Sequence, residues 1–221
     1  MIRPCRPLRV LLAFVLLIGF TTPALAAGTW PVPRGPSHEP NPYRFDPAQI
    51  KRLPKAFLED AAACILYAGN TNLVEADGTI ETITHEVTRL NGRKGIEKLG
   101  EAHNIAYDPS YQQLTLNEAC IHKADGRKLA VEARHVQLRD VATDFQVYDP
   151  EKQLIISFPT LEVGDVIEVK WSVRGKHPEH GRQFFTRYSF GDPSAPVALD
   201  LFRVRLPKEK PFHFATVGGR E

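Results

Sequence analysis

The chain is poor in several residues that mark particular protein classes. Of its 221 residues, three are cysteine, two are tryptophan and one, the initiator, is methionine. Three cysteines are too few for a small disulfide-rich scaffold. A formal net charge of +2 provides no broad basic surface, which argues against binding nucleic acid by bulk charge. The longest apolar run, residues 10–20, is shorter than the ~20 residues that a membrane-spanning helix needs.

Sequence patterns of common active sites and metal sites are also missing. The chain has no G-x-S-x-G turn and no H-E-x-x-H or C-x-x-C pattern. Neither Cys64 nor Cys120 lies at an expected helix N-terminus, where a reactive thiolate would be stabilised. We therefore predict no catalytic residue, no cofactor or cofactor-binding residue and no metal-binding residue, and we expect that the domain is not itself an enzyme.

The first 26 residues are typical of a secretory signal peptide. Three arginines and no acid precede the apolar run, and the small-residue sequence Ala-Leu-Ala, which ends at Ala26, follows it. We predict cleavage after Ala26, with Ala27 as the alternative, and no transmembrane segment in the remaining chain. The protein is therefore expected to be exported, either to the periplasm or out of the cell.

Cleavage after Ala26 would leave 195 residues with a net charge of −1 and two cysteines, Cys64 and Cys120. Exported proteins can keep disulfides. A bond between these two cysteines would stabilise the fold by about 3–4 kcal/mol, on the argument that it restricts the unfolded chain. The alternative is two buried free thiols, because both cysteines lie in apolar, strand-like runs.

Residues 27–56 differ from the rest of the chain by their proline content. Seven of the 18 prolines lie between residues 27 and 54. Proline has no amide donor and favours extended backbone. We therefore expect a linker over 27–56, with a short helical turn after Asp46, and a globular domain over 57–217 that begins near Phe57.

Within the expected domain, hydrophobic residues recur at every second position. The clearest case is residues 165–173, where apolar and polar positions would occupy opposite faces of one strand. The apolar positions are Ile167, Val169, Trp171 and Val173, and the polar positions are Glu168, Lys170 and Ser172. Residues 154–158 and 184–190 alternate in the same way.

Irregularities in this alternation and the turn residues complete the fold prediction. The alternation slips by one residue after Leu116 and after Leu201, which predicts two β-bulges. Three pairs suit tight turns between strands, and they are Asp77-Gly78, Asn91-Gly92 and Asp125-Gly126. Only residues 92–103 resemble a helix. The sequence therefore predicts an all-β fold, an antiparallel two-sheet β-sandwich of roughly eight to ten strands.

Two groups of residues could bind a metal ion, but ordinary structural roles explain them better. His177, Glu179 and His180 lie in an expected loop, and two loop histidines without a visible further ligand are more often solvated. Cys120 and His122 form the only Cys-x-His pair and would share a strand face, although we expect Cys120 to face the core.

Two further segments could bind a ligand. The loop 139–152 contains Asp140, Asp144 and Asp149, but the D-x-D-x-D-G calcium pattern is absent and a solvated connection is favoured. Trp171 and the aromatic residues of 184–190 could form a platform for a sugar. These aromatic residues would instead share a strand face with aliphatic neighbours, which favours a place in the sandwich core.

The order of several short motifs resembles one known family. The most specific motif is Pro-x-Leu-x-x-Gly-Asp at residues 159–165, which leads into the strand that carries Trp171. Ahead of it come Ala61-Ala62-Ala63-Cys64-Ile65-Leu66, Ile105-Ala106-Tyr107-Asp108 and Asn117-Glu118-Ala119-Cys120. Over about residues 58–215 the chain resembles the domain of unknown function 3857, an N-terminal domain of exported bacterial proteins that usually precedes a transglutaminase-like domain.

The resemblance implies a β-sandwich without an activity of its own. We expect its partner to be a separate protein or a downstream domain of the transglutaminase-like or protease-like kind. Residues 218–221 would then be the end of a chain that is truncated before such a domain, is split from it, or stands alone. We expect a non-catalytic scaffold or interaction module that binds no nucleic acid. The alternatives are a module that binds cell-envelope glycan or peptide, and a metal-dependent hydrolase built on His177, Glu179 and His180.

Overall fold

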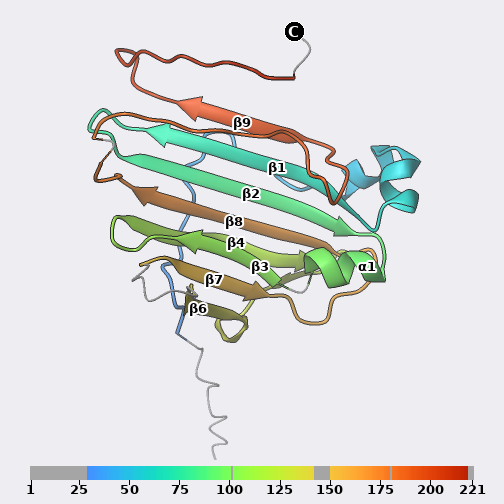
Figure 1. Ribbon diagram of the computed structural model, residues 1–221. Helices are drawn as coiled ribbons and strands as arrows, with labels where there is room; N and C mark the ends of the chain where they lie inside the picture. The colour runs from blue at the N-terminus through green and yellow to red at the C-terminus, as the bar shows by residue number, and fades with distance from the viewer. Residues whose placement is uncertain (1–28, 101, 142–149, 180, 219–221) are drawn as a thin grey trace, which may run out of the picture.

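Two β-sheets make up most of the regular structure in residues 29–100, 102–141, 150–179 and 181–218, which are the residues that the computed structural model describes (Figure 1). The larger sheet has six strands, in the spatial order β5 (Lys128–Ala130), β4 (Gln112–His122), β8 (Val166–Gly175), β2 (Ile80–Leu90), β1 (Ala63–Val74) and β9 (Asp200–Arg205). The smaller has three, in the order β3 (Ala102–Tyr107), β7 (Lys152–Ser157) and β6 (Val136–Asp140). The predicted all-β sandwich is confirmed.

The strand pairing departs from the prediction at one edge of the larger sheet. The paired strands run antiparallel except β1 and β9, which run parallel with Ala68 opposite Asp200. A parallel pair needs a long connection that returns the chain to its starting end. Here that connection approaches β1 before β9 begins, through an isolated bridge between Val197 and Ile65.

The hydrophobic core lies between the two sheets. Leu116 of β4 and Val169 of β8 are buried there against Leu154 and Ile156 of β7. Trp171 packs against the same cluster, so its predicted place in the core is confirmed. Because side chains alternate along a strand, the polar positions of β8 point to the opposite face of the larger sheet. We call this the outer face.

A β-bulge decides which side chains of β4 reach the outer face. The pairing of β4 with β8 shifts between Leu116 and Glu118, as predicted from the sequence. Leu116 before the shift and Ala119 after it both contact the core. Cys120 and His122 therefore point to the outer face, and the prediction that Cys120 faces the sandwich core is wrong.

Residues 29–60, the N-terminal segment, cover the outer face (Figure 1). The segment begins beside the core with Val32 and passes the edge of β4 through a bridge between Arg34 and Leu116. It then packs Tyr43 and Phe45 on the outer face. The prediction that the globular part begins near Phe57 is therefore wrong. Proline keeps this segment out of the strand ladders, but it does not prevent the side chains between the prolines from packing.

Two short helical stretches end the N-terminal segment. They are η1 (Pro47–Arg52) and η2 (Ala56–Asp60). The carboxylate of Asp46 accepts a hydrogen bond from the Ala48 amide at 2.9 Å and caps η1. The helical turn predicted after Asp46 is thus confirmed, because aspartate at the N-cap satisfies an amide that has no partner inside the helix.

Two of the three predicted turns connect neighbouring strands. Gly78 and Gly126 have φ angles of +94° and +90° and form the tips of the β1–β2 and β4–β5 hairpins. The pair Asn91-Gly92 does not form a hairpin, since Gly92 is the N-cap of a helical stretch. This stretch comprises α1 (Arg93–Gly95) and η3 (Ile96–Gly100), so the predicted helix ends before His103, which lies in β3.

The motif at residues 159–165 sets up the turn before β8. Asp165 is buried, and its Oδ2 accepts hydrogen bonds from Lys123 Nζ at 2.7 Å and from the Glu162 amide at 2.8 Å. Gly164 has a φ of +97°, a conformation that residues with a side chain rarely adopt. The glycine and the aspartate therefore have structural roles that account for this most specific part of the motif.

Two expectations for the C-terminal part are wrong. Residues 184–190 form no strand, and Phe185 and Phe190 in this segment are exposed rather than buried in the core. β9 pairs with β1 without the register shift predicted after Leu201. Within the described residues, no helix combines the length and the apolar composition that crossing a bilayer requires.

Candidate functional site

Four chemically reactive side chains meet on the outer face because of the strand register. Cys120 of β4 lies directly opposite Glu168 of β8, and His122 lies two residues further along β4 on the same face. On the other side of β8, His85 of β2 is opposite Lys170, which places it diagonally from Glu168. Neighbouring strands are about 5 Å apart, so the four side chains can touch.

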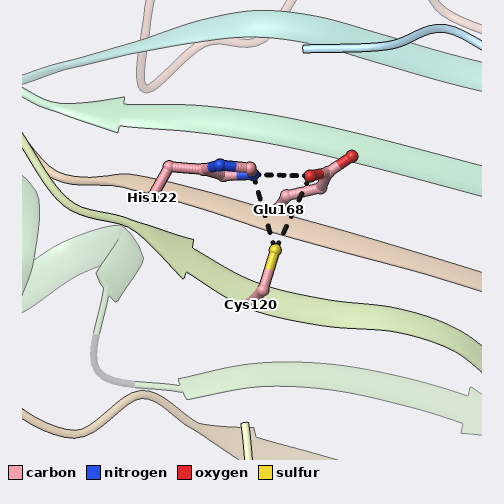
Figure 2. Close-up of side chains that lie close together, drawn as sticks. All are labelled: Cys120, His122 and Glu168. Carbon is pink, nitrogen blue, oxygen red and sulfur yellow. Dashed lines mark hydrogen bonds and ion pairs between the residues drawn. The ribbon is translucent and has the colours of Figure 1, made fainter. Parts of the chain in front are cut away.

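The carboxylate of Glu168 is the centre of this group. Its Oε1 is 2.9 Å from His85 Nε2, and its Oε2 is 2.6 Å from His122 Nε2. Cys120 Sγ lies 3.6 Å from the same Oε2 and 3.5 Å from His122 Nε2. Figure 2 shows Cys120, His122 and Glu168 pointing toward one another from the two adjacent strands β4 and β8.

Aromatic rings and the N-terminal segment cover the group. Phe45 packs edge-on against His122, with ring centroids 4.8 Å apart. Tyr43 stacks on Tyr67 at 4.1 Å, and both rings contact His85 edge-on. Cys120 and His85 are consequently buried, and His122 is partly exposed. A substrate could not reach the thiol without displacing the N-terminal segment.

The electrostatics favour an ionised carboxylate and a neutral thiol. Burial alone would raise the pKa of Glu168, but hydrogen bonds from His122 and His85 outweigh it and hold this pKa well below its ordinary value. Burial, together with the negative charge of Glu168, raises the pKa of the Cys120 thiol. The second outer-face cysteine, Cys64, has its pKa raised to about 11, mainly by burial.

This arrangement differs from a catalytic Cys-His-Glu triad. In a triad the acid binds one imidazole nitrogen and the nucleophile faces the other. Here Glu168 and Cys120 both approach the same atom, His122 Nε2. A raised thiol pKa is also the opposite of what a nucleophilic cysteine needs. As a donor set, however, one sulfur, one nitrogen and one oxygen that lie within 4.8 Å of one another could hold a metal ion.

A second buried polar group joins the N-terminal segment to the sheet. Glu39 Oε2 lies 2.6 Å from Lys170 Nζ, and its Oε1 lies 3.7 Å from the Arg203 guanidinium. Thr71 donates to the same Oε1 at 3.4 Å. Glu39 and Lys170 are both buried. These contacts attach the N-terminal segment to the larger sheet.

Of the residues singled out from the sequence, Cys120 and His122 lie in the group around Glu168, and the others lie apart from it or outside the described residues. Cys64 and Cys120 are both buried free thiols, which is the second of the two alternatives for them. His177 contacts the ring of Tyr111, and its Nδ1 accepts a hydrogen bond from the Glu179 amide at 3.2 Å. His180 is not among the described residues.

Other predicted positions are also partly outside the described chain. Asp140 forms an ion pair with Lys152 at 2.9 Å, at the base of the loop 139–152. Asp144 and Asp149 lie outside the described residues, as does the predicted cleavage site at Ala26. Trp171, for which a sugar platform is the less favoured alternative, packs against the core, and the ring of His103 lies 5.0 Å from its ring.

Sequence reasoning missed His85 and Glu168 as members of one site. Alternation correctly assigns Glu168 to the polar face of its strand, but it does not show that this face is covered. The usable signal is the bulge after Leu116, which turns Ala119 and Ile121 toward the core and so directs Cys120 and His122 to the opposite face. The identity of the neighbouring strands, and hence the contact with Glu168 and His85, does not follow from the sequence.

Comparisons with known proteins identify a family and a fold. The family described as Domain of Unknown Function with solved-structure structure (DUF3857) matches residues 76–221. No curated protein matches the chain. The crystal structure of a protein from Parabacteroides distasonis, described as a "putative protease", is 20% identical, has a TM-score of 0.50, and is similar over 52% of this chain and 23% of its own.

A second solved structure is a CBM3a-L domain from the scaffoldin cipA of the Clostridium thermocellum cellulosome. It is 16% identical, covers 52% of this chain and 68% of its own, and has a TM-score of 0.31, which supports no inference. The first structure supports the fold alone. The chain spans less than a quarter of the length of that protein.

Proposed function

Because the chain belongs to the DUF3857 family, we propose that it is a non-catalytic β-sandwich module of an exported protein and acts by binding a transglutaminase-like or protease-like domain. The partner domain supplies the chemistry, and the sandwich supplies a rigid surface on which it docks. The main support is an unusual concentration of exposed apolar side chains in the last part of the chain.

Six of the seven exposed large hydrophobic side chains in the described residues lie after residue 184. They are Phe185, Phe190, Leu199, Phe212, Phe214 and Val217, and we call them the C-terminal apolar surface. Phe214 is 80% exposed and stacks on Phe212. Single exposed apolar residues are ordinary, but a set rich in phenylalanine on one segment is typical of a protein-binding surface.

The kind of partner is suggested by the solved relative from Parabacteroides distasonis. Most of that protein lies outside the region that is similar to this chain, and the protein is described as a "putative protease". A sandwich of this fold can therefore form a minor part of a larger protein. This observation supports a partner domain with amide-bond chemistry, while the family itself has no assigned function.

The site geometry supports a non-catalytic role. Cys120 is the cysteine with an adjacent histidine, but it is buried beneath the N-terminal segment and its pKa is raised. The nitrogen of His122 that a nucleophile would need is held by Glu168 at 2.6 Å. A cysteine in such surroundings is poorly suited to attack an amide.

The binding proposal is tested with full-length protein, expressed with its own N-terminus and purified after export. It is titrated by calorimetry with a purified transglutaminase-like domain encoded in the same genome. The variant Phe185→Ser/Phe190→Ser/Phe214→Ser should bind at least about 10-fold more weakly, because aromatic residues commonly dominate binding energy. Val163→Ser is the matched control, since Val163 is 57% exposed but lies outside the C-terminal apolar surface.

Equal affinity of the triple variant and the wild type would refute the docking surface. Failure of the wild type to bind any transglutaminase-like domain of that genome would refute the proposed partner. The non-catalytic claim has a separate test, in which the purified protein is incubated with fluorogenic peptides. Amide hydrolysis that disappears in Cys120→Ser would overturn it.

A further inference from the structure

We propose that Cys120, His122 and Glu168 form a binding site for a divalent transition-metal ion of the zinc type, held by one thiolate, one imidazole and one carboxylate. This inference is independent of the partner proposed above. It rests on three donor atoms from two adjacent strands whose separations match those of a small tetrahedral site.

The sulfur is already at the right distance from the other two donors. Zinc lies about 2.3 Å from a thiolate and about 2.0–2.2 Å from nitrogen or oxygen ligands, so tetrahedral angles put the sulfur about 3.5 Å from each of the others. Cys120 Sγ is 3.5 Å from His122 Nε2 and 3.6 Å from Glu168 Oε2. The two distances fit the site without moving the sulfur.

The third distance requires a small adjustment. His122 Nε2 and Glu168 Oε2 are 2.6 Å apart because a hydrogen bond joins them, whereas two ligands of one tetrahedral ion are about 3.3 Å apart. The ion replaces the proton between them, and the pair opens by about 0.7 Å. His122 then carries its proton on Nδ1, and the thiol of Cys120 releases its proton to solvent.

His85 has the position of a residue that orients a metal ligand. It bonds Oε1 of Glu168 at 2.9 Å and leaves Oε2 directed at Cys120 and His122. Carboxylate ligands are commonly held in this way by a hydrogen bond on the second oxygen. His85 does not touch the proposed ion, so we assign it as a positioning residue. Tyr43 and Tyr67 contact its ring edge-on.

Charge and cover are consistent with the proposed ion. The thiolate and the carboxylate together neutralise a divalent cation, and the mixed donor set suits zinc better than calcium or magnesium, which prefer oxygen. Lys128 Nζ lies 4.0 Å from Glu168 Oε2, but the Lys128 side chain is half exposed and lies closer to Glu118, at 3.2 Å. A water molecule completes the four ligands, and Phe45 packs against His122 to shield the site.

The site explains an otherwise unusual pattern of buried polar residues. A carboxylate and two imidazoles beneath an aromatic cover carry a desolvation penalty, and a free thiol lies beside them. One bound ion would join β4 to β8 and convert these groups into a stabilising link. Metal binding should therefore raise the free energy of unfolding, and this gain should grow with the logarithm of the metal concentration once that exceeds the dissociation constant.

The experiment titrates Co²⁺ into the purified, EDTA-treated protein and records the thiolate-to-cobalt charge-transfer absorption in the near ultraviolet. The wild type should give this band with a stoichiometry of one and should release the ion on addition of Zn²⁺. Cys120→Ser should abolish the band. Cys64→Ser is the matched control, because Cys64 is also a buried free thiol on the outer face, and it should retain the band.

Two further variants keep the proposal testable if Cys120→Ser fails to fold. His122→Asn should weaken Co²⁺ binding at least 10-fold while the thiol remains present. His85→Gln should weaken it about 10- to 100-fold and leave the charge-transfer band in place at saturation, as expected for a positioning residue. Circular dichroism and the unfolding midpoint without metal confirm that each variant is folded.

The proposal is overturned if the folded wild type gives no charge-transfer band at millimolar Co²⁺. It is also overturned if Cys120→Ser and Cys64→Ser lower the band equally, or if folded His122→Asn binds as the wild type does. None of these results affects the docking surface, because the C-terminal apolar surface is measured with a protein partner and the metal site with an ion.

Discussion

At the scale of single residues, polar side chains on the alternate positions of a strand can be as buried as apolar ones. Glu168 and Lys170 of β8 are each 8% exposed. Each has a partner of opposite charge or a hydrogen-bond donor from another element. Burial of a polar group is tolerated when such a partner is present.

His103 shows how burial should make stability depend on pH. It lies between the sheets against Trp171, and burial lowers its pKa to about 4, from an ordinary 6.5. Between pH 6.5 and 4 the unfolded chain therefore binds a proton at this position that the folded chain does not. The free energy of unfolding should consequently fall as the pH falls through this range, by up to about 3 kcal/mol.

The neighbouring Glu86 should make the free energy of unfolding rise as the pH falls, which is opposite to the effect of His103. The test therefore uses variants in which Glu86 is replaced. Glu86 lies 3.8 Å from His103, and burial, together with the charge of Asp192, raises its pKa to about 7. Urea unfolding of Glu86→Gln should show a larger loss of stability between pH 6.5 and 4 than urea unfolding of Glu86→Gln/His103→Gln. Parallel pH dependence of the two proteins between pH 7 and 4 would contradict the assignment.

Leu154 provides a residue-scale test of the core. Its side chain is fully buried between the sheets, so Leu154→Ala should lower the free energy of unfolding by about 2–5 kcal/mol through lost burial and a cavity. Leu199→Ala is the control. Because Leu199 is 48% exposed, this substitution should lower the free energy of unfolding much less. Both are measured by urea denaturation. A similar loss in the two variants would place the core elsewhere.

At the scale of elements, the N-terminal segment changes what the larger sheet can do. It converts the outer face from a solvated surface into a second, partly polar core that contains Cys64, Tyr67 and Val87. Its attachment is both apolar, through Phe45, and ionic, through Glu39. The segment therefore belongs to the folded unit although it contributes only an isolated bridge to the sheets.

The ion pair between Glu39 and Lys170 predicts a large effect of a single substitution. Glu39→Ala leaves the buried ammonium of Lys170 without the carboxylate that lies 2.6 Å away, and should cost about 3–5 kcal/mol. Glu39→Leu/Lys170→Met should recover most of the loss. As a control, Glu132→Ala breaks an exposed pair with Arg134 and should cost no more than about 1 kcal/mol.

Chemical denaturation of these variants and the wild type measures the comparison. If Glu39→Ala lowers the free energy of unfolding no more than Glu132→Ala does, the N-terminal segment does not keep Glu39 beside Lys170 in solution. If the double variant is as unstable as the single one, the loss comes from packing of the segment and not from an unpaired charge.

At the scale of the whole molecule, the covered outer face and the exposed apolar side chains belong to different parts of the chain. The outer face is covered by the N-terminal segment, whereas exposed phenylalanines gather in the part of the chain after residue 184. The covered outer face suits a buried ion, and the C-terminal apolar surface suits a protein partner. The two proposals therefore concern different regions and can succeed or fail separately.

Export is a prediction that also concerns the whole chain. The signal pattern predicts that the protein purified from the periplasm or the medium begins at Ala27, or one residue later. Intact mass spectrometry of the exported protein measures this directly. Replacing Ala26 with a bulky residue, as in Ala26→Phe, should impair cleavage and leave a heavier precursor. Recovery of only the uncleaved chain, or of wild type and variant with the same mass, would contradict the predicted site.

The sequence by itself determined the positions of β7 and β8, two hairpin turns and the bulge in β4. These features follow from local rules, namely the alternation of side chains, the positive φ that glycine allows at Gly78 and Gly126, and a one-residue slip after Leu116. The same rules failed for residues 184–190, because alternation of aromatic residues indicates a strand only when a neighbouring strand is available to pair with it.

Only the tertiary structure decided that the reactive groups form one site. Cys120 and Glu168 are 48 residues apart, and their contact depends on which strand lies beside β4 and in what register. The burial of that site depends on a segment rich in proline, whose packing leaves no periodic signal. Alternation shows which side chains share a face of a strand, but the burial of a face is a property of everything that packs against it.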